Sequence, residues 1–137
     1  MANLVAAQDP KWREDKVAEL KATVGGKYFM GGAVVVLAAT GLLSRAVTTA
    51  SAKTAGVVLE TKDLTSAPAG SRIRVQRGGT FEFGYPAGGA TDALVGDLVQ
   101  WVDDNNVETF ASGIKAGIIT EVVSATRVRI KLVETAV

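Results

Sequence analysis

From residue 31 onward the chain alternates short apolar runs, rich in Val, Ile and Thr, with breaks that contain Gly, Asp, Asn or Pro. Such runs at short spacing are typical of strands in an all-β sandwich or barrel, because helices need longer stretches with a 3.6-residue period. The pattern therefore predicts a mainly β protein, with strands at 33–38, 42–48, 55–60, 71–76, 80–84, 97–102, 107–111, 116–123 and 127–133.

Two of these runs, "SRIRVQ" and "TRVRIKLV", alternate strictly between apolar and polar positions. Because successive side chains of a strand point to opposite faces, the apolar residues are expected inside and the basic ones outside. The outward residues that could contact a partner are Arg72, Arg74, Arg127 and Arg129. Outward Arg on a strand is most often a solvated or edge-protecting residue. Aromatic residues follow at 81–85, so an oligonucleotide-binding barrel stays open as an alternative.

The first 26 residues follow a different pattern. Residues 1–9 lack a clear period, whereas Asp9 can cap a helix and Pro10 suits its first position. We expect a short helix over 10–17, and beyond it "VAELKATV" fits either more helix or a short strand. The chain is accordingly divided into an N-terminal arm with a short helix, 1–26, and a single β-barrel or sandwich domain, 27–137.

The β region also repeats itself. "GAVVVLAATGLL" (32–43) parallels "GDLVQWVDDNNV" (96–107), "TAGVVLE" (54–60) parallels "KAGIITE" (115–121), and "RIRVQ" (72–76) parallels "RVRIK" (127–131). Three matches in the same order indicate an internal pseudo-repeat, a duplicated β-hairpin-plus-strand unit.

The cluster Asp103-Asp104-Asn105-Asn106 is interpreted through this repeat. It falls where the other copy has Ala38-Ala39-Thr40-Gly41, and a place filled by small residues in one copy is a turn. Asp and Asn suit a turn because they adopt left-handed dihedrals and bond their own backbone. The alternatives are a calcium site, which would need spaced oxygen ligands and a downstream Glu, and a contact with a partner.

Composition narrows the chemistry further. The 137 residues contain no His and no Cys, which removes the usual general base, the commonest metal ligand and any thiol nucleophile. The Gly pairs at 78–79 and 88–89 lack the strand–loop–helix context of a phosphate cradle. We therefore expect no enzyme activity, no catalytic, cofactor-binding or metal-binding residues, no cofactor and no small-molecule substrate. The net charge of +1 provides no strong field for nucleic acid or an anionic membrane.

The apolar residues of the chain predict no membrane span. The most apolar stretch, 33–43, is well short of the ~20 residues that cross a membrane. Trp101, in "LVQWV", is expected to pack in the core, with a subunit interface as the alternative. No basic-then-apolar segment opens the chain, so no signal peptide is expected.

Over residues 27–134 the chain resembles the head decoration, or capsid cement, proteins of tailed double-stranded-DNA bacteriophages. The likeness lies in "GGAVVVLAATGLL", "AGVVLE", "SRIRVQRGGTFEF", "VGDLVQW", "KAGIITE" and the final "RVRIKL". The helix-like "DPKWREDKVAEL" is not part of that pattern.

The resemblance implies a non-enzymatic β-barrel protein of the virion. Such a protein assembles, typically as a homotrimer, on the outer surface of the expanded capsid head and bridges subunits of the major capsid protein. Besides the four outward Arg residues, the expected partner contacts lie in the arm: Leu4, Val5, Trp12 and Arg13. An arm of this kind can order on a partner surface. The alternatives are another β-barrel virion component, such as a tail or fibre base, and the nucleic-acid-binding barrel.

Overall fold

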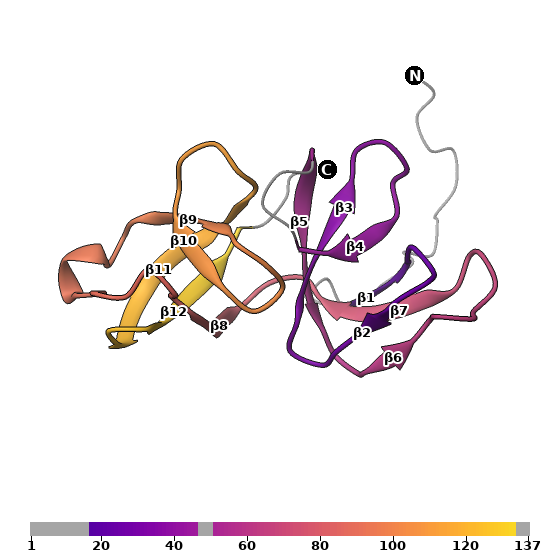
Figure 1. Ribbon diagram of the computed structural model, residues 1–137, viewed down its shortest axis with the longest axis horizontal. Coiled ribbons are helices and arrows are strands. Elements are labelled where there is room, and N and C mark those ends of the chain that lie inside the picture. The colour runs from indigo at the N-terminus through magenta and orange to yellow at the C-terminus, as the bar shows by residue number, and fades with distance from the viewer. Residues whose placement is uncertain (1–16, 47–50, 134–137) are drawn as a thin grey trace, which may run out of the picture.

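The computed structural model describes residues 17–46 and 51–133, which form two β-lobes side by side (Figure 1). Lobe 1 contains β1 (Val17–Lys21), β2 (Lys27–Tyr28), β3 (Ala33–Leu37), β4 (Leu43–Arg45), β5 (Ala52–Val58), β6 (Lys62–Asp63) and β7 (Arg72–Gln76). Lobe 2 contains β8 (Thr80–Gly84), the short 3-10 helix η1 (Asp92–Leu94), β9 (Leu98–Trp101), β10 (Val107–Thr109), β11 (Lys115–Ser124) and β12 (Arg127–Leu132). The prediction of a mainly β protein is confirmed, and each strand expected from residue 33 onward is present.

Each lobe is built on one antiparallel five-stranded sheet. The strand order is β1-β7-β5-β3-β4 in lobe 1 and β10-β9-β11-β12-β8 in lobe 2, and β2 and β6 add a small ribbon to lobe 1. The two edge strands of each sheet approach at one point only, through the bridges Ala22–Leu43 and Gly84–Asn106. Neither sheet is therefore a closed barrel, and of the two expected architectures the sandwich-like one is found.

The internal repeat is confirmed by the sheets themselves. Taken in the order β4-β3-β5-β7-β1, lobe 1 matches lobe 2 strand for strand. The backbone bond from Gly31 N–H to Val58 O, 2.9 Å, has its counterpart from Gly96 N–H to Ile119 O, 2.8 Å. Residues that pair across strands also correspond: Ala33 with Val57 in lobe 1, Leu98 with Ile118 in lobe 2.

One detail of the sequence match changes. The strand pairings make Ala33 the structural counterpart of Leu98, whereas the sequence match made it the counterpart of Asp97. The first strand of the match 32–43 to 96–107 therefore shifts by one residue. The reason is the segment between the last paired residues of the hairpin. It spans 37–42 in lobe 1 and 102–106 in lobe 2, and is thus one residue shorter in lobe 2.

The repeat also extends further toward the N-terminus than the sequence indicated. Val17–Lys21 form a strand, not the continuation of a helix, and β1 pairs with β7 as β8 pairs with β12. In this register Glu19 lies opposite Arg74 and Glu82 opposite Arg129. The first sheet therefore begins before residue 26, the expected boundary of the arm. The expected helix over 10–17 falls almost wholly outside the described residues.

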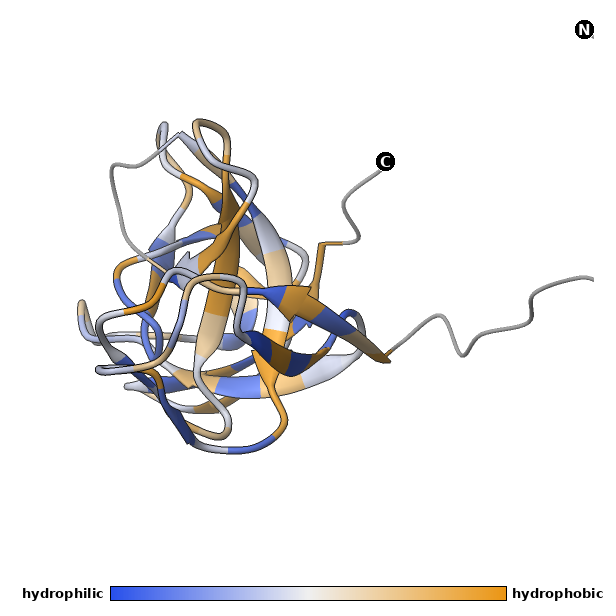
Figure 2. Ribbon diagram, turned by 90° about the vertical axis from the view of Figure 1, so that its right-hand side faces the viewer, coloured by the Kyte–Doolittle hydropathy of each residue, from blue (hydrophilic) through white to orange (hydrophobic). Residues whose placement is uncertain are grey.

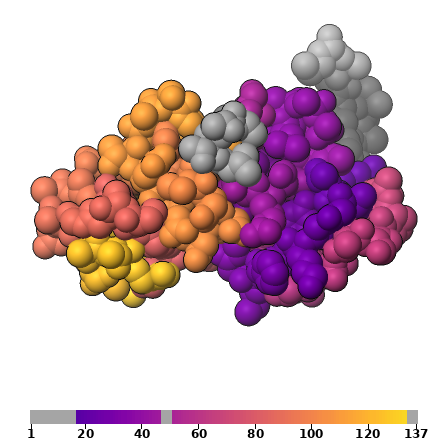
Figure 3. Space-filling model, viewed as in Figure 1, coloured from indigo at the N-terminus to yellow at the C-terminus, as the bar shows by residue number. Residues whose placement is uncertain are grey.

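The buried apolar residues form two cores. The first lies inside lobe 1, around Leu43, Ile73 and Val75. The second fills lobe 2, around Trp101, Phe83 and Ile130, and includes residues from the outer face of the lobe 1 sheet: Ala33, Val35, Ala46 and Val57. Figure 2 shows the alternation of polar and apolar residues as successive blue and orange bands along the strands. Because the second core contains residues of both lobes, they form a single domain, as Figure 3 shows by their close contact.

Trp101 is the centre of the shared core. Its side chain is fully buried, and its ring meets that of Phe83 edge to face with centroids 5.0 Å apart. Its Nε1–H donates to Thr54 Oγ1 of lobe 1 at 2.9 Å, and the Thr54 hydroxyl donates to Lys115 O of lobe 2 at 2.5 Å. The expectation of a core position for Trp101 is confirmed, and the residue also connects the two lobes.

Candidate protein-contact surface

Two exposed large apolar side chains are neighbours in the turn after β2. Phe29 is 49% exposed and Met30 69% exposed. The turn is held by its backbone, because Met30 N–H donates to Thr61 Oγ1 at 3.0 Å and Gly31 N–H to Val58 O at 2.9 Å. Gly31 has a φ of 85°, which glycine adopts without strain. The two apolar side chains are therefore presented by a fixed turn.

The residue before this turn is an anchor. Tyr28 is buried, and its hydroxyl donates to Thr23 O at 2.8 Å. Burial raises the pKa of the phenol above its ordinary value, and the nearby Arg45 partly opposes this rise. One side chain thus fixes the turn to the lobe 1 core while the next two point outward.

Arg45 completes the surface beside Phe29. Its guanidinium lies over the Phe29 ring, 5.7 Å from the centroid, and its Nε–H donates to Asp104 Oδ2 at 2.8 Å. The hydrogen bond that Arg45 donates to Asp104 is the main cause that raises the pKa of Arg45, and partial burial opposes it. A cation at this distance from an aromatic face is attracted by the ring quadrupole, so Arg45 and Phe29 hold each other in place.

The carboxylate that orients Arg45 comes from the predicted turn at 103–106. Asp103 Oδ1 accepts the Asn105 N–H at 2.8 Å and the Asn106 Nδ2–H at 3.0 Å, which makes this segment a corner between β9 and β10. The prediction of a turn is thus confirmed. Asp104 has a further role, because its backbone O accepts the Ala33 N–H of lobe 1 at 2.8 Å.

These residues surround an open hollow of about 340 Å³ where the lobes meet. It is lined by Phe29, Met30, Gly31, Gly32, Arg45, Asp104 and Asn105. Aromatic residues, Met and Arg are the types enriched at protein–protein interfaces. Within residues 17–46 and 51–133, no three or more acidic side chains come together as metal ligands would. We refer to Phe29, Met30 and Arg45 as the junction surface.

The four Arg residues expected to contact a partner occupy matching places in the two lobes. Arg72 and Arg74 lie on β7, and Arg127 and Arg129 on β12. Arg127 forms an ion pair with Glu82 and Arg129 one with Glu121, at 2.9 Å for the latter. Arg72 Nη1–H donates to Glu19 O at 3.2 Å. Their outward orientation is confirmed, while their contact with a partner stays a prediction.

The remaining expected contacts, Leu4, Val5, Trp12 and Arg13, lie outside the described residues. The junction surface was missed from the sequence, although a signal is present. "GGKYFMGG" (25–32) places three apolar residues between two Gly pairs, and such a short apolar segment in a loop is a candidate for an exposed contact.

Among the described residues no helix is long and apolar enough to span a bilayer. Comparisons with protein-family models, with curated proteins and with solved structures each found no match to this chain.

Proposed function

We propose that this chain is a structural virion protein that binds the outside of an expanded phage capsid as an oligomer and bridges subunits of the major capsid protein. The proposal starts from the resemblance of residues 27–134 to capsid decoration proteins. The observation that carries it furthest is the junction surface, where Phe29 and Met30 are exposed on a fixed turn and Arg45 is oriented by Asp104.

A fixed apolar surface suits binding to another protein. Ordering a rotamer-rich side chain on binding costs about 0.5–1.5 kcal/mol, and a surface that is already ordered avoids part of this cost. The Met30 side chain is 69% exposed, while its backbone and the neighbouring Phe29 and Arg45 are held by the contacts described above. A small number of such anchors supplies most of the free energy of many interfaces.

The construction of the domain also suits a clamp. The lobes share one apolar core and are linked by the Trp101–Thr54–Lys115 hydrogen bonds. In the described part of the chain, every buried side-chain nitrogen or oxygen has a hydrogen-bond partner. A force applied at the junction surface would therefore act on both lobes together, which bridging of subunits under internal pressure requires.

The test is binding of the purified protein to expanded phage heads stripped of their decoration. Wild type is expected to bind at saturable positions on the head, and Met30→Glu to bind at least about tenfold more weakly, a loss of about 1.4 kcal/mol. Val95→Glu is the matched control, because Val95 is also exposed, by 49%, but lies in lobe 2, away from the junction surface.

Absence of wild-type binding to expanded heads would refute the proposal. Electron microscopy of the native assembly separates it from the alternative of a tail or fibre-base component, since that alternative places the density on the tail. The nucleic-acid-binding alternative is disfavoured because Arg127 and Arg129 already have carboxylate partners. It predicts an affinity that falls steeply with salt concentration.

A further inference from the structure

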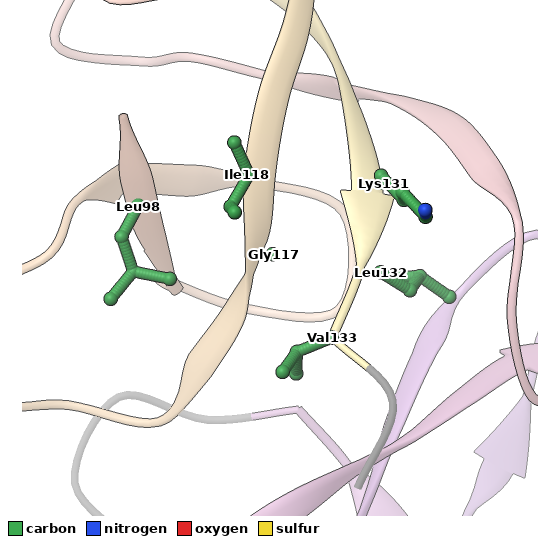
Figure 4. A pocket seen from close by; sticks show the side chains of 6 residues that line it. All are labelled: Leu98, Gly117, Ile118, Lys131, Leu132 and Val133. Carbon is green, nitrogen blue, oxygen red and sulfur yellow. The ribbon is translucent and has the colours of Figure 1, made fainter. Parts of the chain in front are cut away.

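Lobe 2 carries an apolar groove on the outer face of its sheet (Figure 4). None of the residues that line this groove belongs to the junction surface. The groove has a volume of about 310 Å³ and is lined by Leu98, Gly117, Ile118, Lys131, Leu132 and Val133. Ile118 is 48% exposed. Figure 4 shows Ile118 next to Gly117 on one strand and Leu98 on the neighbouring strand, with the Lys131 amine directed away from both.

The repeat identifies the corresponding face of lobe 1. Ala33 and Val57 pair there as Leu98 and Ile118 pair in lobe 2. In lobe 1 this face is covered: Ala33 is 0% and Val57 3% exposed, and both belong to the core shared with lobe 2. The same structural face is therefore buried in one copy of the repeat and open in the other.

The cover on lobe 1 is formed by one end of lobe 2. The corner 102–106 reaches Ala33 through the Asp104 backbone O, at 2.8 Å from the Ala33 nitrogen. Lobe 1 has the equivalent end, the connection 38–42 between β3 and β4, with Ala39, Thr40 and Gly41 exposed. Lobe 1 thus has both an outer sheet face and a connection end. Within the molecule, lobe 2 covers the outer face, whereas the connection end stays exposed.

The composition of the two unused surfaces also agrees. Within the molecule, Arg45 of lobe 1 is paired with Asp104 of lobe 2. The register gives Arg45 the counterpart Thr109, and the 38–42 connection contains no charged residue in the place of Asp104. Both members of this ion pair are replaced by uncharged residues, so the equivalent contact would bury neither an arginine nor an aspartate at these two places.

From this we infer that the lobe 2 groove docks the 38–42 end of lobe 1 of a second copy of this chain. The contact repeats between molecules the arrangement that already exists between the lobes. It joins two different surfaces, so it is head to tail and produces a ring if the rotation closes, or an open filament if it does not. The inference rests on the proposed function in so far as it identifies the self-contact of the proposed oligomer.

Glycine allows neighbouring strands to approach closely at matching places in the two sheets. A Cβ on Gly56 or on Gly117 would overlap the backbone O of Gln76 or Lys131 respectively. Neither position therefore has room for a side chain, and Gly117 is one of the residues that line the groove. At the other end of this face, Gln100 of lobe 2 is covered by its own loop, since its Oε1 accepts the N–H groups of 111–113. The open part is the end that corresponds to the Asp104 contact.

The experiment uses the purified protein alone, by size-exclusion chromatography with light scattering and by sedimentation velocity over a range of concentrations. Wild type is expected to form an oligomer, and Ile118→Glu and Ala39→Glu are each expected to raise the dissociation constant at least tenfold. Val123→Glu is the control, because Val123 lies on the same strand and is 44% exposed but does not line the groove. Circular dichroism checks the fold of each variant, and Ile118→Thr replaces Ile118→Glu if the latter does not fold.

A mixture of Ile118→Glu and Ala39→Glu then tests the direction of the contact. Each variant keeps one intact surface, so a head-to-tail contact gives heterodimers and nothing larger. A wild-type monomer at all concentrations, an oligomer unaffected by Ile118→Glu, or a mixture that forms no heterodimer would each overturn the inference. These outcomes are independent of the proposed function, since the capsid-binding assay with Met30→Glu is scored separately.

Discussion

The two lobes have the same arrangement of strands but differ in the size of the side chains in their cores. At the place where lobe 1 has Val36, only partly buried, lobe 2 has the fully buried Trp101. Where lobe 1 has Leu20, lobe 2 has Phe83. The larger core of lobe 2 also receives the outer face of lobe 1. The repeated hydrogen bonds thus give both lobes the same sheet. The larger side chains of lobe 2 form the core against which the outer face of lobe 1 packs.

The largest expected effect separates the lobes at one pair of equivalent positions. Trp101→Ala should lower the free energy of unfolding by about 3–5 kcal/mol, because it removes the centre of the shared core and leaves a cavity. Val36→Ala should lower it by about 1 kcal/mol, since two methyl groups are lost from a partly buried side chain. Urea unfolding of both variants measures the difference. Equal losses would show that the lobes do not divide the core as described.

A second pair tests where the lobes are alike. Gly56→Ala and Gly117→Ala should each cost about 1–3 kcal/mol, because in both the added methyl meets the backbone of the neighbouring strand. Gly26→Ala is the control, since nothing lies within 4 Å of a Cβ placed there. Urea midpoints compare the three variants. The strand pairing is irregular next to both glycines. A neutral result at either Gly56 or Gly117 would contradict the equivalence of these two places.

The link between the lobes is tested at Thr54. Thr54→Val keeps the shape of the side chain but removes the hydroxyl that accepts the Trp101 Nε1–H and donates to Lys115 O. A buried donor left without a partner costs about 1–3 kcal/mol, and the Trp101 fluorescence should change with it. Thr80→Val is the control, because Thr80 is an exposed threonine on a strand of lobe 2. An unchanged emission spectrum and stability would mean that this bond does not hold the lobes together.

Much of this comparison could be predicted from the sequence. The alternation in "RIRVQ" and "RVRIK" gave the correct inward and outward faces, and three matched segments gave the repeat. The match of "VAELK" with "TFEFG" was missed, because only Glu19 and Glu82 are identical and helix punctuation precedes the first of them. Pairing with β7, a contact with residues more than fifty positions away, decides that Val17–Lys21 is a strand.

The junction surface could not be derived in the same way. Phe29, Arg45 and Asp104 are far apart in the sequence and meet only because the corner of lobe 2 lies on the face of lobe 1. The turn at 103–106 follows from local chemistry, but its contact with Ala33 depends on how the two lobes pack. Local patterns therefore predict the elements of this protein, whereas contacts between the copies of the repeat require the three-dimensional arrangement.

The smallest expected effect concerns the β2–β6 ribbon, which lobe 2 lacks. The Thr65 hydroxyl and backbone N–H donate to Asp63 and lower the pKa of that carboxyl, with a smaller contribution from Lys27. A lowered pKa means that the stabilisation is present above the ordinary value of 3.8 and is lost as the pH falls through the lower folded value. Asp63→Asn should therefore slightly lower the urea midpoint at neutral pH and flatten its decrease in acid. Thr65→Val should reproduce part of both changes, because it removes one donor. Since Asp63 is exposed, a large loss in either variant would show that the ribbon supports lobe 1 more strongly than its short pairing indicates.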